Sequence, residues 1–387
     1  MRRDLLLSLI LVAIVPIRVG ASKSATSKND DDIWCQNPHG KNVEWFIMYK
    51  APKTASTNRS MQRYELRGSE YGYFDSENPA DSQAFLDGGN NIYLDRNNSL
   101  ANTLRRIFRQ NSSDNAELVY IVYNDQPPPG MSNSTSNGHT KGVVIFGART
   151  GLWIVHSVPR FPDKLFTGKY SFPNSARENG QTIICTTFNI DKLNTIAAHL
   201  RKQNPTMYAA SAPAALRSKY KELDLLFNKT FNPEEPFVAI DVLQAINGTA
   251  FTAFAKNGRL NKDIYSGVLA PTLETNLFVE SWQNGNGGKL FPDLLDKYKV
   301  VDVKEIALRV GQKVMRWNSH EDHSKWAIGN ETDWVCIGSI NRMKSQFKRG
   351  GETLCLQHSV VHGLFAKAMV KHASYSIDKI RTCGRVL

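Results

Sequence analysis

The chain has 387 residues, of which 41% are hydrophobic and 22% charged, and its formal net charge is +12. These fractions are ordinary for a globular protein. A basic surface suits nucleic acid or an anionic membrane surface as a partner, and equally a basic secreted protein that binds neither. After the first 21 residues no stretch is long and apolar enough to cross a bilayer, which excludes a membrane-spanning mature chain.

The N-terminus is predicted to be a secretory signal peptide over residues 1–21. Arg2 and Arg3 form a basic start, Leu5 to Ile17 an apolar core, and residues 19–21 are small enough for cleavage. Residues 22–33 are small, polar and charged, and are expected to be a disordered lead-in. Secretion agrees with seven N-x-S/T sequons, which predict a glycoprotein of the lysosome or the extracellular space. Six of them are predicted glycosylation sites: Asn58, Asn97, Asn111, Asn133, Asn228 and Asn247.

About 365 residues remain, more than one hydrophobic core usually serves, so two halves are expected. Short strands punctuated by helices predict an α/β layer structure in both. Strands are predicted over 43–49, 71–74, 118–123, 142–147, 152–156 and 181–188, then near 250–255, 276–282, 305–317, 326–329 and 333–341. Helices are predicted over 100–110, 190–203, 213–227 and 357–370. The predicted halves cover residues 34–203 and 237–387, and residues 204–236 connect them.

The pattern His-x-Lys occurs twice in matching contexts, at His139 to Lys141 and at His323 to Lys325. Each copy is followed by an apolar strand, a tight turn and a returning strand that carries a tryptophan. Residues i and i+2 of a strand point to one face, so each histidine should project together with its lysine. Two such pairs could converge on one phosphodiester.

The matched pairs predict phosphoryl transfer. One neutral imidazole attacks phosphorus to form a phosphohistidine, and the other, protonated, gives its proton to the leaving oxygen. Lysines beside them neutralise the phosphate oxygens in place of a metal, and no clustered Asp/Glu pattern suits two magnesium ions. Acid conditions would keep the lysines and neighbouring imidazoles cationic. The alternative is that each histidine is an ordinary strand residue that makes one hydrogen bond.

Five cysteines occur in a chain predicted to be secreted, so disulfides are expected. The odd number leaves one cysteine unpaired or pairing elsewhere, and there is no CxxC to suggest a zinc ribbon or a thioredoxin-type site.

Stretches from about residue 34 to the C-terminus resemble, in order, the deoxyribonuclease II (acid DNase) family, a branch of the phospholipase D superfamily. The chain is similar to that family at Trp34-Cys35, 43–53, 71–73, 123–128, 139–142, 153–162, 181–188, 322–327 and 350–355. The resemblance implies a phospholipase D-like pseudo-dimer, two α/β sandwich halves in one chain with the active site at their interface. It also implies metal-independent endonucleolytic cleavage of double-stranded DNA at acid pH, leaving 3′-phosphate and 5′-hydroxyl ends, with no cofactor.

Carried over residue by residue, the resemblance gives His139 and His323 as the catalytic imidazoles, with His139 favoured as nucleophile and His323 as acid. Lys141 and Lys325 become phosphate binders, and His156 matches a further histidine that supports activity. The superfamily signature continues with GSxxN-like text, which survives here approximately as Gly338-Ser339-Ile340-Asn341 and makes Asn341 a candidate for substrate binding.

The chain departs from the wider superfamily at the aspartate of HxKx4D, which is Phe146 in the first copy and Asn330 in the second. This loss argues against lipid headgroup exchange. Asn330 is also the seventh sequon, and neither role is assigned to it. The resemblance further suggests the disulfides Cys35 with Cys185 and Cys336 with Cys355, and it leaves Cys383 without a partner.

Three functions remain open at this point. The first is a lysosomal or secreted acid endonuclease that degrades apoptotic or engulfed DNA. The second is a phospholipase D-like phosphodiesterase that acts on lipid, and the third an inactive relative that only binds nucleic acid. The sequence does not decide between a monomer and a homodimer.

Overall fold

The computed structural model describes residues 32–53, 66–89, 91–109, 116–131 and 136–373. The predicted signal peptide, Cys383 and the sequons at Asn58, Asn111 and Asn133 lie outside these residues. None of the described helices is long and apolar enough to span a membrane.

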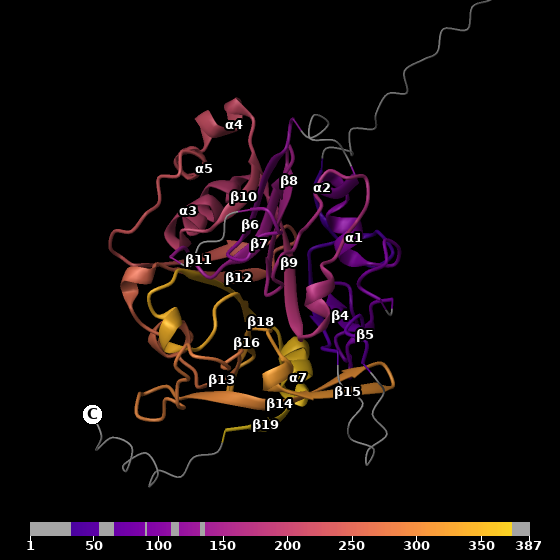
Figure 1. Ribbon diagram of the computed structural model, residues 1–387, viewed down its shortest axis with the longest axis vertical. Coiled ribbons are helices and arrows are strands. Elements are labelled where there is room, and N and C mark those ends of the chain that lie inside the picture. Colours follow the sequence, from indigo (N-terminus) through magenta and orange to yellow (C-terminus); the bar gives the residue numbers. More distant parts are fainter. Residues whose placement is uncertain (1–31, 54–65, 90, 110–115, 132–135, 374–387) are drawn as a thin grey trace, which may run out of the picture. The chain divides into compact units, whose positions relative to one another are not determined.

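Two large sheets make up an α/β fold, as predicted (Figure 1). All neighbouring strands of the first sheet are antiparallel. In spatial order they are β10 (Met207–Ser211), β6 (Val119–Asn124), β7 (Lys141–Phe146), β8 (Thr150–His156), β9 (Gln181–Asn189), β3 (Trp45–Lys50), β4 (Tyr71–Asp75) and β5 (Leu86–Asp87). A separate small pair, β1 (Cys35–Gln36) and β2 (Asn42–Val43), precedes it along the chain.

The second sheet has one parallel pair, β13 with β14, among antiparallel neighbours. Its order is β11 (Val238–Gln244), β12 (Ala250–Lys256), β18 (Gly351–Gln357), β17 (Trp334–Gly338), β16 (Trp326–Gly329), β13 (Leu277–Glu280), β14 (Val300–Val310) and β15 (Lys313–Asn318). The last strand, β19 (Met369–His372), pairs with β14.

The sheets share one core because their central strands are apolar on both faces. Along β3, Trp45, Ile47 and Tyr49 enter a core that also holds Leu354 and Leu356 of β18. The alternate residues of β3 point to a second core, under the helices α1 (Ser99–Thr103) and α2 (Arg105–Arg109). A third core lies on the other face of the second sheet, under α6 (Ala270–Leu273).

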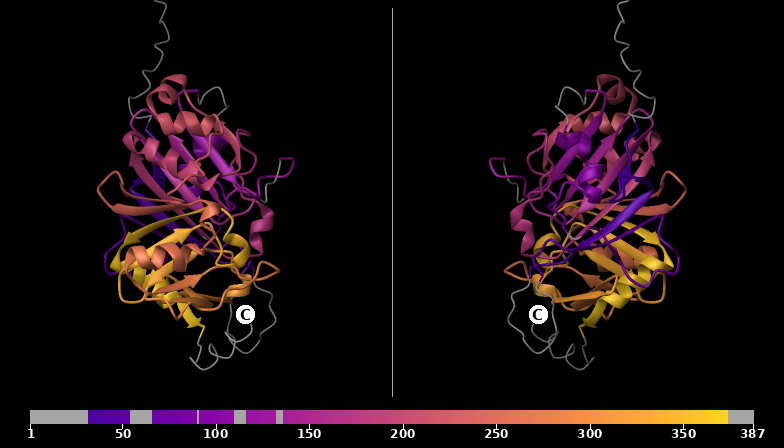
Figure 2. Two further views of the ribbon diagram at one scale, coloured as in Figure 1. Left: turned by 90° about the vertical axis from the view of Figure 1, so that its left-hand side faces the viewer. Right: turned by 90° about the vertical axis from the view of Figure 1, so that its right-hand side faces the viewer.

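Two helices, α3 (Leu193–Gln203) and α7 (Ser359–Ala368), contribute apolar residues to the shared core. The elements can be followed by colour in the two side views of Figure 2. The helices α4 (Ala214–Lys219) and α5 (Lys221–Phe227) follow β10 in the predicted connection, and Leu223 and Leu226 of α5 enter the shared core. Buried side chains of the two sheets therefore pack against each other, so residues of both sheets can build one site.

Element boundaries differ from the sequence prediction where a local break interrupts a regular pattern. The predicted strand 305–317 is a hairpin of β14 and β15, because Gly311 turns the chain with a φ of 54°. The helix predicted over 213–227 is broken at Tyr220, whose backbone is extended. The helix predicted over 100–110 is two short helices, and the last predicted helix ends at Ala368, where β19 begins. Strands β1, β5, β10, β11, β18 and β19 were not predicted.

Both predicted disulfides are confirmed. Cys35 and Cys185 join β1 to β9 across 150 residues of sequence. Cys336 and Cys355 lie directly opposite each other on β17 and β18, with Cα atoms 4.0 Å apart.

Candidate active site

Each His-x-Lys pair stands at the start of a strand of its own sheet. Lys141 is the first residue of β7, and Lys325 directly precedes β16. Both histidines therefore lie just before their strands, where the sequence had placed them within the strands.

The backbone of each histidine is bonded to the opposite sheet. The amide of His139 donates to the carbonyl of Gly350, just before β18, at 2.9 Å. The amide of His323 donates to the carbonyl of Gly180, just before β9, also at 2.9 Å. A side chain at position 350 does not fit, because a Cβ there would lie 1.9 Å from the carbonyl oxygen of Gln203. Neither pair of catalytic candidates is thus held by its own sheet alone.

A buried lysine supports each of these glycine segments. At the end of β3, Lys50 donates from Nζ to the carbonyls of Ala176 at 2.6 Å and Arg177 at 3.2 Å, shortly before Gly180. At the end of β12, Lys256 donates in the same way to residues 346 and 347, at 3.1 and 2.8 Å, shortly before Gly350. Burial lowers the pKa of Lys50 to about 7 and that of Lys256 to about 8. The two sheets repeat one arrangement around the two histidines.

The orientation of the His139 ring is set by the second sheet. Its Nδ1 lies 2.6 Å from the carbonyl oxygen of Ser339, which can only accept, so Nδ1 carries the proton and donates it. In the neutral ring Nε2 therefore keeps its lone pair. Burial, together with Lys141, Lys325 and Arg349, lowers the pKa of His139 to about 3, although Asp125 opposes the shift.

Asp125 lies among the cationic side chains around His139. Its carboxylate pairs with Lys141, lies 3.3 Å from the guanidinium of Arg349 and 3.9 Å from Nε2 of His139. Its side chain is only 4% exposed. Burial alone would raise the pKa of Asp125, but His139, Lys141 and Arg349 together hold it well below its usual value. The aspartate is thus ionised in the folded state and fixes the ammonium of Lys141.

His323 is less buried and opens onto a cavity of about 420 Å³. The other lining residues are numbers 126–131, 159–160, 175, 179 and 181, all from the first sheet's side of the chain. Its ring also contacts that of Trp282, with centroids 5.0 Å apart. Burial, Lys325, Lys141 and His139 lower the pKa of His323 to about 3. Ser339, whose carbonyl accepts from the His139 ring, directly follows Gly338, whose amide donates to the carbonyl of Lys325 at 2.9 Å, so both His-x-Lys pairs lie in one cluster.

Lys325 is buried in that cluster, and its Nζ donates to the carbonyl of His323. Burial and the charge of Lys141 lower its pKa to about 7. Glu280, at the end of β13, is fully buried nearby, and neither of its carboxylate oxygens has a partner among the described residues. Burial, with Asp322 and Asp302, raises the pKa of Glu280 well above its usual value, so its carboxyl is neutral.

His156 lies beside the first pair. The register of β7 and β8 sets Gly142 opposite Val155, and therefore Lys141 opposite His156. Its Nδ1 accepts from the amide of Val158 at 3.1 Å, and its Nε2 has no partner among the described residues. Burial lowers the pKa of His156 to about 3.

Asn341, the other candidate, follows β17 and is buried, and its Oδ1 has no partner in the described part of the chain. Asn330 is exposed at the turn after β16, so it is not a buried site residue. Asn97, Asn228 and Asn247 are exposed as well.

Sequence reasoning missed Asp125, Arg349 and the two glycines. Asp125 could have been found, because it ends a buried strand and lies within one of the stretches that carry the family resemblance. Gly350 begins another such stretch, but Arg349 carries no comparable local signal, since its role depends on a contact more than 200 residues away in sequence.

The chain is similar to known proteins over most of its length. The family model described as "Deoxyribonuclease II" matches residues 34–375. The chain is 35% identical to deoxyribonuclease-2-alpha of Rattus norvegicus over 325 residues, 84% of this chain and 89% of that protein. It is 32% identical to plancitoxin-1 of Acanthaster planci over 367 residues, 94% of this chain and 96% of that protein. Cell death-related nuclease 6 of Caenorhabditis elegans is 32% identical over 345 residues, 86% of each chain.

Proposed function

Because the chain belongs to the deoxyribonuclease II family, we propose that it is an acid endonuclease that hydrolyses DNA without a metal ion. The products are 3′-phosphate and 5′-hydroxyl ends. The observation that carries this proposal is a geometric one: His139 hydrogen-bonds to Ser339, and the neighbouring Gly338 donates to the carbonyl of Lys325 at 2.9 Å, so the two His-x-Lys pairs lie in one cluster. Relatives that match this chain over most of their length are named deoxyribonucleases, which supports DNA as the substrate.

We assign the nucleophile to His139, because its Nδ1 donates to Ser339 and leaves Nε2 free to attack. Nε2 bonds to phosphorus, the bond from phosphorus to the 5′ oxygen breaks, and that oxygen takes a proton from protonated His323. Water then attacks the phosphohistidine and gives a proton to the now neutral His323 as the bond from phosphorus to nitrogen breaks. This restores both imidazoles and leaves the phosphate on the 3′ oxygen.

The lysines neutralise the non-bridging oxygens of the phosphate. Lys141 and Lys325 both come from the buried cluster, where a charge acts more strongly than it does in water. Asn341 is proposed as an additional contact to the substrate, since its side-chain amide can donate from Nδ2 to a phosphate oxygen. His156 is proposed to support the site from its place opposite Lys141.

Acid pH follows from the same burial. With pKa values of about 3, both histidines of the free site stay neutral until a phosphate arrives. An anionic diester favours the charged form of His323, and a lower pH brings that protonation within reach. Lys325, with a pKa of about 7, also carries its charge only below neutrality. The site is therefore expected to work at acid pH.

The surroundings of the enzyme are proposed on the same basis. A predicted signal peptide and the exposed sequons at Asn97, Asn228 and Asn247 support a glycoprotein of the lysosome or the extracellular space. The relative named cell death-related nuclease 6 supports a role in degrading apoptotic or engulfed DNA. We also propose that the two sheets are the halves of a phospholipase D-like pseudo-dimer.

The test is digestion of plasmid DNA at about pH 5 in excess EDTA, with His323→Ala alongside. Cleavage to 3′-phosphate ends that the substitution abolishes would support the mechanism. Activity that needs an added divalent metal would contradict it. Cleavage of a phospholipid but not of DNA would favour the lipid phosphodiesterase, and DNA binding without turnover the inactive relative.

A further inference from the structure

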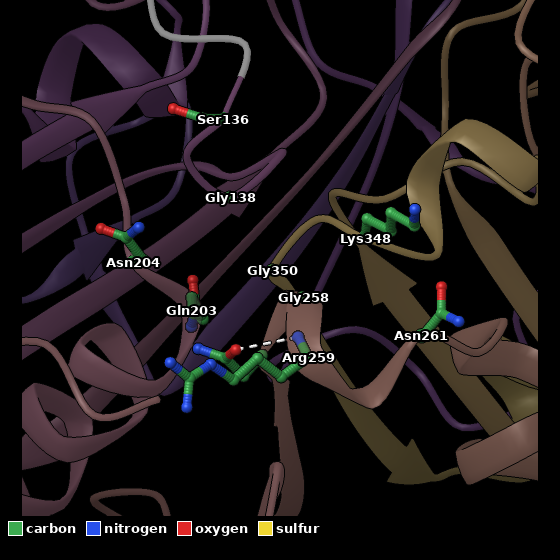
Figure 3. A pocket seen from close by; sticks show the side chains of 10 residues that line it. Ser136, Gly138, Gln203, Asn204, Gly258, Arg259, Asn261, Lys348 and Gly350 are labelled. Atoms are coloured by element: carbon green, nitrogen blue, oxygen red, sulfur yellow. Dashed lines mark hydrogen bonds between the residues drawn. The ribbon is translucent and has the colours of Figure 1, made fainter. Parts of the chain in front are cut away.

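A second cavity, of about 380 Å³, lies next to His139. Four segments meet around it: residues 136–138, 203–204, 257–261 and 348–350 (Figure 3). Residues 136–138 precede β7 and residues 203–204 lie at the end of α3, both on the side of the first sheet. The other two segments connect strands of the second sheet. The cavity therefore lies where the two sheets' chains meet, as the candidate active site does.

The wall of this cavity is the backbone that carries His139. Gly138 directly precedes the histidine, and Gly350 accepts its amide hydrogen at 2.9 Å. Arg349 joins the two, because its guanidinium donates to the carbonyls of Asn137 at 2.9 Å and Gly138 at 3.2 Å and also contacts Asp125. A Cβ at Gly138 would lie 2.4 Å from the carbonyl of Gln203, so glycine is required for this close approach.

The lining is cationic and amide-rich. Arg259 and Lys348 are its charged residues, and no carboxylate is among its lining side chains. The amides come from Gln203, Asn204, Asn257 and Asn261. Figure 3 shows three of them, Gln203, Asn204 and Asn261, around the cavity together with both cations.

Both cations are available to a ligand. Arg259 lies 3.8 Å from Glu234, but the two side chains are 59% and 79% exposed, so the pairing is weak. Lys348 is exposed, and no carboxylate of the described residues lies within 4.0 Å of its ammonium.

This lining suits a phosphate and a sugar better than a base. Bases bound without sequence preference usually stack on aromatic side chains, and none lines the cavity. Lysine, arginine and amide groups are the usual partners of phosphate oxygens. We propose that this cavity is a subsite for a backbone phosphate of the DNA strand, next to the phosphate that is cleaved. The proposal rests on the proposed function and adds Lys348 and Arg259 as substrate-positioning residues.

The test compares Lys348→Ala, Arg259→Ala and the double variant with wild type. The control is Lys371→Ala, which removes the same charge from an exposed position on the distant strand β19. Cleavage of a DNA duplex is measured at several salt concentrations, and cleavage of bis(4-nitrophenyl) phosphate, a diester with no flanking phosphate, in parallel.

We expect KM for DNA to rise with each substitution at the cavity, more than kcat falls. The slope of log kcat/KM against log salt should become shallower by about 0.9 for each charge removed. The double variant should lose far more activity on DNA than on the small diester, and Lys371→Ala should leave both unchanged.

Two results would overturn the subsite. One is that the cavity variants behave like Lys371→Ala on DNA, and the other is that both substrates lose activity equally, which would place the residues at the reacting centre. In either case wild-type cleavage of DNA would leave the proposed function standing. Wild-type protein that does not cleave DNA would instead refute the proposed function.

Discussion

Glu352 provides a direct test of how burial acts at the junction of the sheets. It lies on β18, fully buried, and Tyr123 of the first sheet donates to its Oε2 at 2.8 Å. Trp153 in turn donates to the hydroxyl of Tyr123 at 2.9 Å. Burial raises the pKa of Glu352 from 4.5 to about 8, although hydrogen bonds to the carboxyl oppose the shift. We predict that Glu352→Gln makes the protein's stability less dependent on pH.

The sign follows from proton linkage. Between about pH 4.5 and about pH 8 the folded protein keeps a proton on Glu352 that the unfolded chain has lost. Stability from this group is therefore complete below the unfolded pKa and is lost as pH rises toward the folded one. From pH 5 to pH 8 the loss is about 3.5 kcal/mol, at about 1.36 kcal/mol for each pH unit after allowing for partial titration at both ends. For a chain of this size it corresponds to roughly 5 °C in Tm.

The measurement is Tm by tryptophan fluorescence or calorimetry at about pH 5, 6.5 and 8. Glutamine keeps the shape of the carboxyl but cannot ionise, so the variant should match wild type near pH 5 and exceed it at pH 8. Glu331→Gln, at an exposed turn position, is the control and should follow wild type. If the Tm of Glu352→Gln falls in parallel with that of wild type, the carboxyl is not protonated in the folded state and the reasoning is wrong.

Three further predictions concern the candidate active site and the disulfide between β1 and β9. Asp125→Asn should lower kcat for DNA about 10- to 100-fold when measured well below Tm, because Lys141 loses its buried anchor; an unchanged kcat would contradict this. Activity should fall as pH rises through about 7, where Lys325 loses its proton, and a pH–rate profile that stays flat to pH 9 would exclude Lys325 as a phosphate binder. Removing the disulfide by Cys35→Ala with Cys185→Ala should destabilise the protein by about 5 kcal/mol, since it closes a loop of 150 residues; denaturant unfolding measures this.

Local sequence patterns were enough to predict the strands that carry the site. The continuous apolar runs at 45–50 and 119–124 and the hairpin of β7 and β8 are buried on both faces, so their hydrophobicity is unambiguous. The buried strand β18 was missed because the polar residues Glu352 and Thr353 interrupt its apolar pattern. Strands β10 and β11 were missed because their exposure mixes the pattern. Strand β11 alternates irregularly, with Ile240 and Val242 both substantially exposed at the edge of the sheet, and β10 is only half-buried.

The two His-x-Lys pairs were predicted from their repetition, and His156 and Asn341 from the family resemblance. Both His-x-Lys pairs are visible because they recur in similar contexts, and the structure brings them into one cluster. The residues that support the two pairs do not form a repeated sequence motif. Lys50 and Lys256 occupy equivalent places at the ends of β3 and β12, yet the residues around them share no motif that a sequence comparison within the chain would detect.

A last prediction follows from the hydrogen bonds by which each sheet holds the histidine of the other. His139 is bonded to Gly350 and Ser339 of the second sheet, and His323 to Gly180 of the first. Either half alone would therefore lack the acceptor that orients its histidine, and would expose the core that the sheets share. We expect fragments that end at residue 232 and begin at residue 233, within the predicted connection, to be inactive separately and active after co-expression. Fluorogenic DNA cleavage at acid pH measures this, and the uncut chain with His323→Ala gives the background. Activity of the first fragment alone would show that one His-x-Lys pair suffices, and the two-histidine mechanism would then be wrong.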